Sequence, residues 1–104
     1  MTSLRQLHYL VLVADFRSFR RAADAAGVSQ PTLSQQLRVL ETRLGATLVE
    51  RNETPVQLTP IGRDVVARAR RILIEVKDLE GMVQRTSAGI GGIIRFGVTP
   101  TLGP

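Results

Sequence analysis

The chain has 104 residues, a length that favours a single domain with a modest core, and it carries 14 basic and 9 acidic side chains. It contains no cysteine, which excludes disulfides and thiolate metal sites, and nothing else in it indicates a cofactor. Its apolar N-terminal stretch is too short and too interrupted for a signal peptide or a membrane span, so we expect a cytoplasmic protein.

The basic excess is confined to one part of the chain. Residues 1–71 hold 11 basic and 6 acidic side chains, whereas residues 72–104 hold three of each. An uneven distribution of this kind indicates a polyanionic partner for the N-terminal part.

Local signals predict the first two helices. Apolar residues recur at helical spacing between Ser3 and Asp15, which predicts a first helix. Ser18 is a good N-cap for a second helix, FRRAADAA, and Gly27 is placed to end it.

A third helix starts almost at once, in the segment SQPTLSQQLRVLE. Ser29 caps it, and Pro31 falls in its first turn, where a missing N–H costs nothing. So tight a connection predicts a helix-turn-helix, in which three small residues let the helices cross closely: Ala22, Ala23 and Ala26.

The third helix has two distinct faces. Four leucines form a predicted core arc: Leu33, Leu37, Leu40 and Leu44. A second arc holds residues that are uncharged or basic: Gln30, Pro31, Ser34, Gln35, Arg38 and Thr42. A merely solvated face more usually carries Glu and Lys, so the second arc is typical of a base-reading surface. The segment alone leaves open an ordinary amphipathic helix in a plain αα-hairpin.

After Gly45 the apolar pattern changes to period two. The segments TLVERN and PVQLT flank a polar tip at residues 52–55 and predict a small hairpin. A hairpin directly after a recognition helix is a wing, and wings contact phosphates or the minor groove.

Thr59 and Pro60 begin a long helix that we expect to reach about Ala88. Its apolar residues follow a heptad spacing: Val65, Ala69, Ile72, Val76, Leu79 and Val83. At 1.5 Å per residue the helix is roughly 40 Å long, too long for this domain to bury alone. We therefore expect a second copy to cover the seam, with the chain's own winged domain covering the first turn or two.

The remaining residues predict the beginning of another domain. The small, glycine-rich segment SAGIGG predicts a flexible hinge. The apolar segment IIRFGV predicts a buried strand, and such a strand needs a sheet that this sequence does not contain. We expect a mainly α chain in three parts: a winged helix-turn-helix over 1–59, a linker and dimerisation helix over 60–88, and over 89–104 a hinge and the first strand of a truncated C-terminal α/β effector-binding domain.

Together these elements resemble a known family. The stretch AADAAGVSQPTLSQQLRVLETRLGATLVERN, the wing segment VQLTPIG and the long helix before IIRFGV resemble the N-terminal region of LysR-type bacterial transcriptional regulators. FRRAAD, ILIEVKDLEGM and GVTPTLGP are similar to the peroxide-sensing OxyR branch. The resemblance implies a homodimer made by antiparallel linker helices, usually assembled into tetramers, that binds an interrupted palindrome near promoters. It also implies a C-terminal domain that senses a small molecule or a redox signal.

The resemblance also assigns roles to residues of the third helix. Gln30, Pro31, Ser34 and Gln35 match the base-facing group, and three residues would lie nearer the phosphates: Ser29, Thr32 and Arg38. Two positions depart from the family. Gln35 stands where arginine is common and suits adenine in place of guanine. Thr54 stands at the wing tip, where a basic residue is common, so entry of the wing into the minor groove stays open.

Arginines around the motif are expected to supply affinity for the DNA backbone: Arg20, Arg21, Arg38, Arg51 and Arg63. Arg51 has a second interpretation, an ion pair with Glu41 or Glu50 that holds the wing on the helix. Arg20 and Arg21 also fit simple solvated charges. His8 has no partner at metal-ligand spacing, so we interpret it as a surface or interface residue.

Three other classes of protein remain to be weighed. An enzyme is disfavoured by the single histidine, the lack of cysteine and the lack of a glycine-rich phosphate loop. A sequence-blind architectural DNA-binding protein would share the charge but would protect no defined site. A pure dimerisation module would not need the basic excess in residues 1–71.

Overall fold

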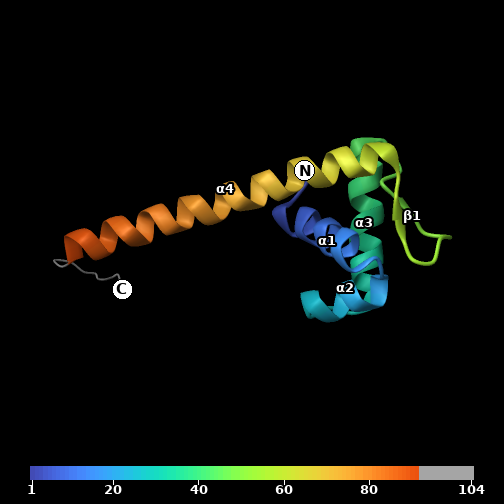
Figure 1. Cartoon of the computed structure of the whole chain (residues 1–104), viewed down its shortest axis with the longest axis horizontal. Helices are drawn as coiled ribbons and strands as arrows, with labels where there is room; N and C mark the ends of the chain where they lie inside the picture. Colours follow the sequence, from blue (N-terminus) through green and yellow to red (C-terminus); the bar gives the residue numbers. More distant parts are fainter. Residues whose placement is uncertain (92–104) are drawn as a thin grey trace. The chain divides into compact units, whose positions relative to one another are not determined.

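The computed structural model describes residues 1–91, with side chains described to residue 86, so the strand expected in IIRFGV lies outside the described residues. The elements, in chain order, are α1 (Leu4–Phe16), α2 (Phe19–Ala26), α3 (Gln30–Leu44), β1 (Val49–Glu50), β2 (Gln57–Leu58) and α4 (Pro60–Gly91) (Figure 1). This order is the winged helix-turn-helix followed by a long helix that the sequence predicts. Helix α4 continues past the predicted end at Ala88.

Side-chain caps fix where the first three helices begin. The hydroxyl groups of Ser3, Ser18 and Ser29 each accept the N–H of the residue three positions later. Helices α2 and α3 end at Gly27 and Gly45, which have φ of 72° and 69° and so use the left-handed conformation that glycine adopts without strain. The predicted caps at Ser18, Gly27 and Ser29 are therefore confirmed.

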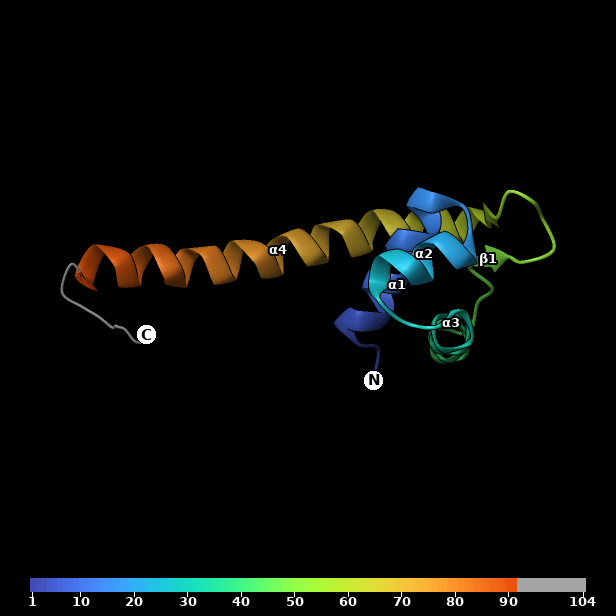
Figure 2. The same cartoon turned by 90° about the horizontal axis from the view of Figure 1, so that it is seen from below.

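The compact unit Met1–Leu73 is built around one apolar core. Its largest fully buried side chains come from α1, α3 and the start of the wing: Leu10, Val13, Leu33, Leu37, Leu40, Leu48 and Val49. Ala22 and Ala23 of α2 are also buried, as close crossing of the helices requires. In Figure 2, where α3 is seen end-on, α1 and α2 lie to one side of it, and no other element of this unit covers the opposite side.

The first turns of α4 belong to this unit, so the boundary expected at residue 59 falls inside it. Val66 and Ala69 are 5% and 1% exposed and take part in the core. The assignment of Ala69 to a seam with a second chain therefore needs correction, because its own domain already buries it. Val65 is half-buried against the same core, as expected for the first turn or two.

The second unit, Ile74–Pro104, is described as helix up to Gly91. Four large apolar side chains on it are more than half exposed: Ile74, Leu79, Met82 and Val83. No helix within residues 1–91 has both the length and the apolar character needed to cross a membrane.

Candidate nucleic-acid interface

The polar arc of α3 lies at the surface of the folded unit. Its members are exposed except for Ser34, which is half-buried. Leu33, Leu37 and Leu40 on the other arc are at most 1% exposed. Leu44 departs from the prediction because it is the last residue of α3 and is 45% exposed, so the core arc ends at Leu40.

The charged side chains of the α3 polar arc and of the start of α2 are basic. Arg38 is exposed, and the polar arc contains no acidic side chain. At the start of α2, Arg20 and Arg21 are exposed as well. Arg20 lies 3.9 Å from Asp24, with both side chains about three-quarters exposed, so this ion pair is weak. The Arg21 guanidinium lies 5.4 Å from the centre of the Phe16 ring, a cation–π contact that leaves the charge at the surface.

Ser29 and Thr32, two of the candidate residues near the phosphates, form the N-terminal cap of α3. The Ser29 hydroxyl oxygen accepts the Thr32 N–H at 3.2 Å, and the same hydroxyl donates to Thr32 Oγ1 at 2.8 Å. Both residues are exposed at the N-terminus of α3, where backbone N–H groups also favour an anion.

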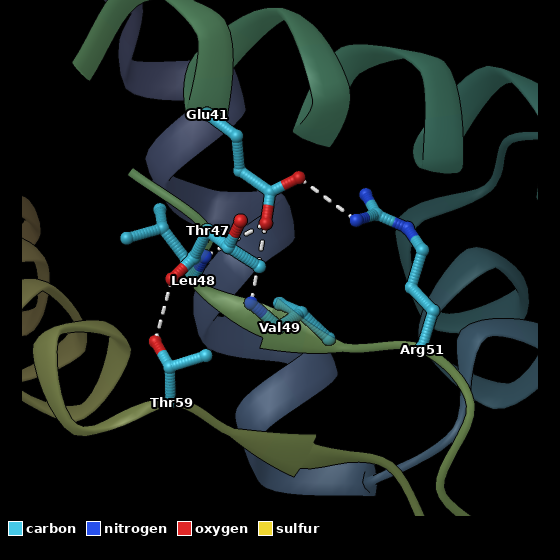
Figure 3. Close-up of polar contacts among 6 residues, drawn as sticks. All are labelled: Glu41, Thr47, Leu48, Val49, Arg51 and Thr59. Atoms are coloured by element: carbon cyan, nitrogen blue, oxygen red, sulfur yellow. Dashed lines mark hydrogen bonds and ion pairs between the residues drawn. The ribbon is translucent and has the colours of Figure 1, made fainter. Parts of the chain in front are cut away.

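Arg51 does not lie at the surface with the other arginines. Its side chain is only 19% exposed, and its Nη1 donates to Glu41 Oε1 at 2.8 Å (Figure 3). The guanidinium lies 5.4 Å from the centre of the Phe19 ring, and Nε and Nη2 are buried without a hydrogen-bond partner in the part of the chain that the structure describes. Of the two interpretations of Arg51, the structure supports the ion pair that holds the wing, and a phosphate contact would require this side chain to leave its site.

Glu41 is the acceptor for three donors of the wing. One oxygen accepts the N–H groups of Leu48 and Val49, at 2.8 and 3.2 Å, and the other accepts Arg51 (Figure 3). Burial by itself raises the pKa of Glu41, but the hydrogen bonds from Arg51, Leu48 and Val49 and the positive charge of Arg51 outweigh it, so the net pKa is lowered. Glu41 is therefore ionised at neutral pH and joins α3 to β1.

The second strand of the wing is held from the end of α1. Strands β1 and β2 pair antiparallel, with Val49 opposite Leu58. The carbonyl oxygen of Arg17 accepts the Val56 N–H at 3.1 Å, and Arg17 Nη1 donates to Gln57 Oε1 at 3.2 Å. The predicted wing is therefore present, and both of its strands are tied to helices of the unit.

Three residues of this framework were missed by sequence reasoning. Arg17 has a φ of 54°, which its residue type does not signal. Gln6 is 5% exposed and donates from Nε2 to Gln36 Oε1 at 3.1 Å, which joins α1 to α3. The pattern Ser3-x-x-Gln6 is a capping box and could have marked Gln6 as a structural residue.

Other candidate residues are spread over the surface. Arg63 is exposed and donates to the Leu58 carbonyl oxygen at 3.4 Å. Glu53 and Thr54 are exposed at the wing tip, and His8 is exposed on α1. Among the described residues, no three His, Cys, Asp or Glu side chains lie together as metal ligands would.

Comparison with known proteins assigns this arrangement to a family. Residues 4–63, more than half of the chain, match the family described as "Bacterial regulatory helix-turn-helix protein, lysR family". The chain belongs to the LysR family.

Its LysR relatives include the "DNA-binding transcriptional dual regulator OxyR" of Escherichia coli (strain K12), with 46% identity over 102 residues, 98% of this chain and 33% of that protein. The "Hydrogen peroxide-inducible genes activator" of Dickeya chrysanthemi gives the same identity and coverage. The chain thus spans about a third of the length of the curated relatives it matches.

Solved structures of LysR proteins share the fold. The BenM DBD in complex with benA site 1 DNA is 39% identical, with a TM-score of 0.81 over 85% of this chain and 99% of that one. The full-length OxyR C199D of Pseudomonas aeruginosa is 38% identical, with a TM-score of 0.78 over 82% of this chain and 29% of that one. This chain is therefore a LysR-family DNA-binding domain.

Proposed function

We propose that this domain reads a specific duplex sequence by placing the polar arc of α3 in the major groove. Gln30, Pro31, Ser34 and Gln35 face the bases, and three residues lie nearer the phosphates: Ser29, Thr32 and Arg38. The observation that carries the proposal is an arc of hydrogen-bonding side chains at the surface of α3 without an acidic member. The likeness to BenM bound to two different DNA sites supports it.

Affinity for the DNA backbone comes from exposed arginines of α2, α3 and α4. Arg20, Arg21 and Arg63 join Arg38 in this role, and each phosphate contact releases counterions, which contributes about −0.9 to the slope of log K against log salt. Arg51 is not part of this group, because Glu41 already holds its guanidinium.

We further propose that the domain works as a homodimer through α4. Three seam residues have exposed side chains, Ile72 at 37%, Leu79 at 58% and Val83 at 55%, and Val76 is half-buried. Exposed apolar residues at this spacing are stabilised when a second helix covers them. Antiparallel pairing of two such helices would place two copies of α3 on successive major grooves, and so read an interrupted palindrome, before further assembly into tetramers.

For the whole protein we propose a cytoplasmic regulator that responds to peroxide through an effector domain. The relatives named hydrogen peroxide-inducible genes activators support this assignment. This chain has no cysteine, so a thiol that reacts with peroxide would have to lie outside it.

Selection from a pool of random-sequence duplexes tests the DNA-reading proposal. The chain is expected to enrich a pair of half-sites related by two-fold symmetry, and footprinting should show protection over both. Enrichment of no sequence, with binding that depends only on salt, would contradict it and favour the architectural alternative.

A further inference from the structure

Arg51 and Glu41 join three elements that lie near the proposed DNA surface. Arg51 follows β1 at the start of the wing, Glu41 belongs to the second half of α3, and Phe19 is the first residue of α2. The ion pair of 2.8 Å links the wing to α3 (Figure 3). The cation–π contact of 5.4 Å between Arg51 and Phe19 links the wing to α2.

The pair is suited to fixing an orientation because it is mostly buried. The two side chains are 19% and 13% exposed, so solvent screens their attraction less than that of a surface pair. Removing one partner would leave the other charge buried without compensation, which costs far more than losing a surface pair. Within the described residues, Nε and Nη2 of Arg51 have no hydrogen-bond partner, so Glu41 and the Phe19 ring are the contacts that offset the burial of the guanidinium.

We propose that Glu41 and Arg51 are positioning residues that hold the wing, α3 and the start of α2 in the arrangement that recognises DNA, without touching DNA themselves. The proposal rests on the proposed function. Specific binding requires α3 and the wing to meet the duplex together, whereas nonspecific binding depends mainly on charge and tolerates a displaced wing. Loss of the pair should therefore reduce discrimination between sequences.

The substitution Glu41→Gln separates positioning from direct contact by the sign of its effect. If Arg51 contacted a phosphate, removing the carboxylate would release its guanidinium and raise the net charge by one, and binding would strengthen. If the pair positions the wing, specific binding should weaken although the chain has become more basic.

The chain offers a matched control in Glu50, an exposed residue of β1 next to Arg51. Glu50→Gln makes the same change in charge at the position that precedes Arg51, and no hydrogen bond or ion pair of the Glu50 side chain is among the described contacts. We expect Glu50→Gln to strengthen binding to all duplexes slightly and alike.

The experiment measures the dissociation constant of each variant for two probes at fixed salt. One is a duplex selected from the random pool by the unaltered chain, and the other is an unrelated duplex of equal length. Relative to Glu50→Gln, Glu41→Gln should lose specific affinity by about 5- to 50-fold, the range for residues coupled in one network, with little change for the unrelated duplex. A smaller folded fraction would lower both affinities equally, so their ratio isolates positioning from stability.

Arg51→Lys provides a second variant that retains the charge, for use if Glu41→Gln does not fold. A direct phosphate contact would largely survive this change, whereas positioning by a planar guanidinium over Phe19 would not, so the ratio should again fall. An unchanged ratio or stronger specific binding would overturn the proposal. If the unaltered chain itself selects no sequence, the proposed function fails instead.

Discussion

Gly62 in the first turn of α4 lies directly against the carbonyl oxygen of Leu48, where the chain enters β1, and a Cβ at this position would collide with that oxygen. Thr59 holds the same junction, since its hydroxyl donates to the Thr47 carbonyl oxygen at 2.6 Å (Figure 3) and accepts the Gly62 N–H at 3.0 Å. The missing side chain therefore sets how closely the start of α4 approaches the wing.

Gly62→Ala is expected to destabilise the chain by about 1–3 kcal/mol, because backbone must shift to admit the Cβ. Gly81→Ala is the matched control on the same helix. The new Cβ there would meet only the flexible end of the Arg85 side chain, so alanine should stabilise the helix by up to about 1 kcal/mol. Chemical denaturation of both variants measures the two effects, and equal effects would contradict the close approach at Gly62.

Gln35→Ala should relax sequence preference, with a loss of about 1–3 kcal/mol of discrimination for a bidentate contact to a base. Arg38→Ala should weaken binding to all duplexes alike and make the salt slope shallower by about 0.9. Titrations of selected and unrelated duplexes over a range of salt concentrations distinguish the two. A Gln35→Ala variant with full discrimination would remove this residue from the reading surface.

Leu79→Glu combined with Val83→Glu should convert a dimer into a monomer, because four buried charges would face each other across the seam. Both residues are more than half exposed, so the winged domain should remain folded. Ile74→Glu is the control, since Ile74 is also exposed but lies on the opposite side of α4 from the seam. Sedimentation of both variants gives the answer, and a dimer that survives the double change would place the interface elsewhere.

Acid should weaken the tie between α3 and the wing. The pKa of Glu41 is lowered in the folded chain, so its contribution to stability is present above the ordinary glutamate pKa of about 4.3 and is lost as the pH falls through the lowered value. The stability difference between the unaltered chain and Glu41→Gln should therefore shrink below about pH 4.3. Urea titrations at several pH values measure it, and a difference that stays constant down to the acid limit would argue against an ionised Glu41 in the folded state.

Much of the fold could be predicted because its signals are local. A serine cap or a C-terminal glycine acts within one turn, so the limits of α2 and the start of α3 needed no knowledge of distant residues. The exposed polar arc of α3 followed in the same way, since the leucines on the other arc fix which side turns inward.

Long-range contacts explain where the structure differs from the sequence-based prediction. Periodicity predicted that Leu44 belongs to the core and that Ala69 faces a second chain, but it carries no information on where a packing partner ends or begins. The buried link between Gln6 and Gln36 joins residues 30 positions apart, which no local pattern encodes.

The sequence by itself determined the helices, the wing, the exposed polar face of α3 and the uneven charge, because each depends on neighbouring residues or on composition. Only the tertiary structure decided what Arg51 does. An arginine reaches a phosphate or a carboxylate according to what the fold brings near it, and here folding places Glu41 and Phe19 around a guanidinium for which the sequence left both a phosphate contact and an ion pair open.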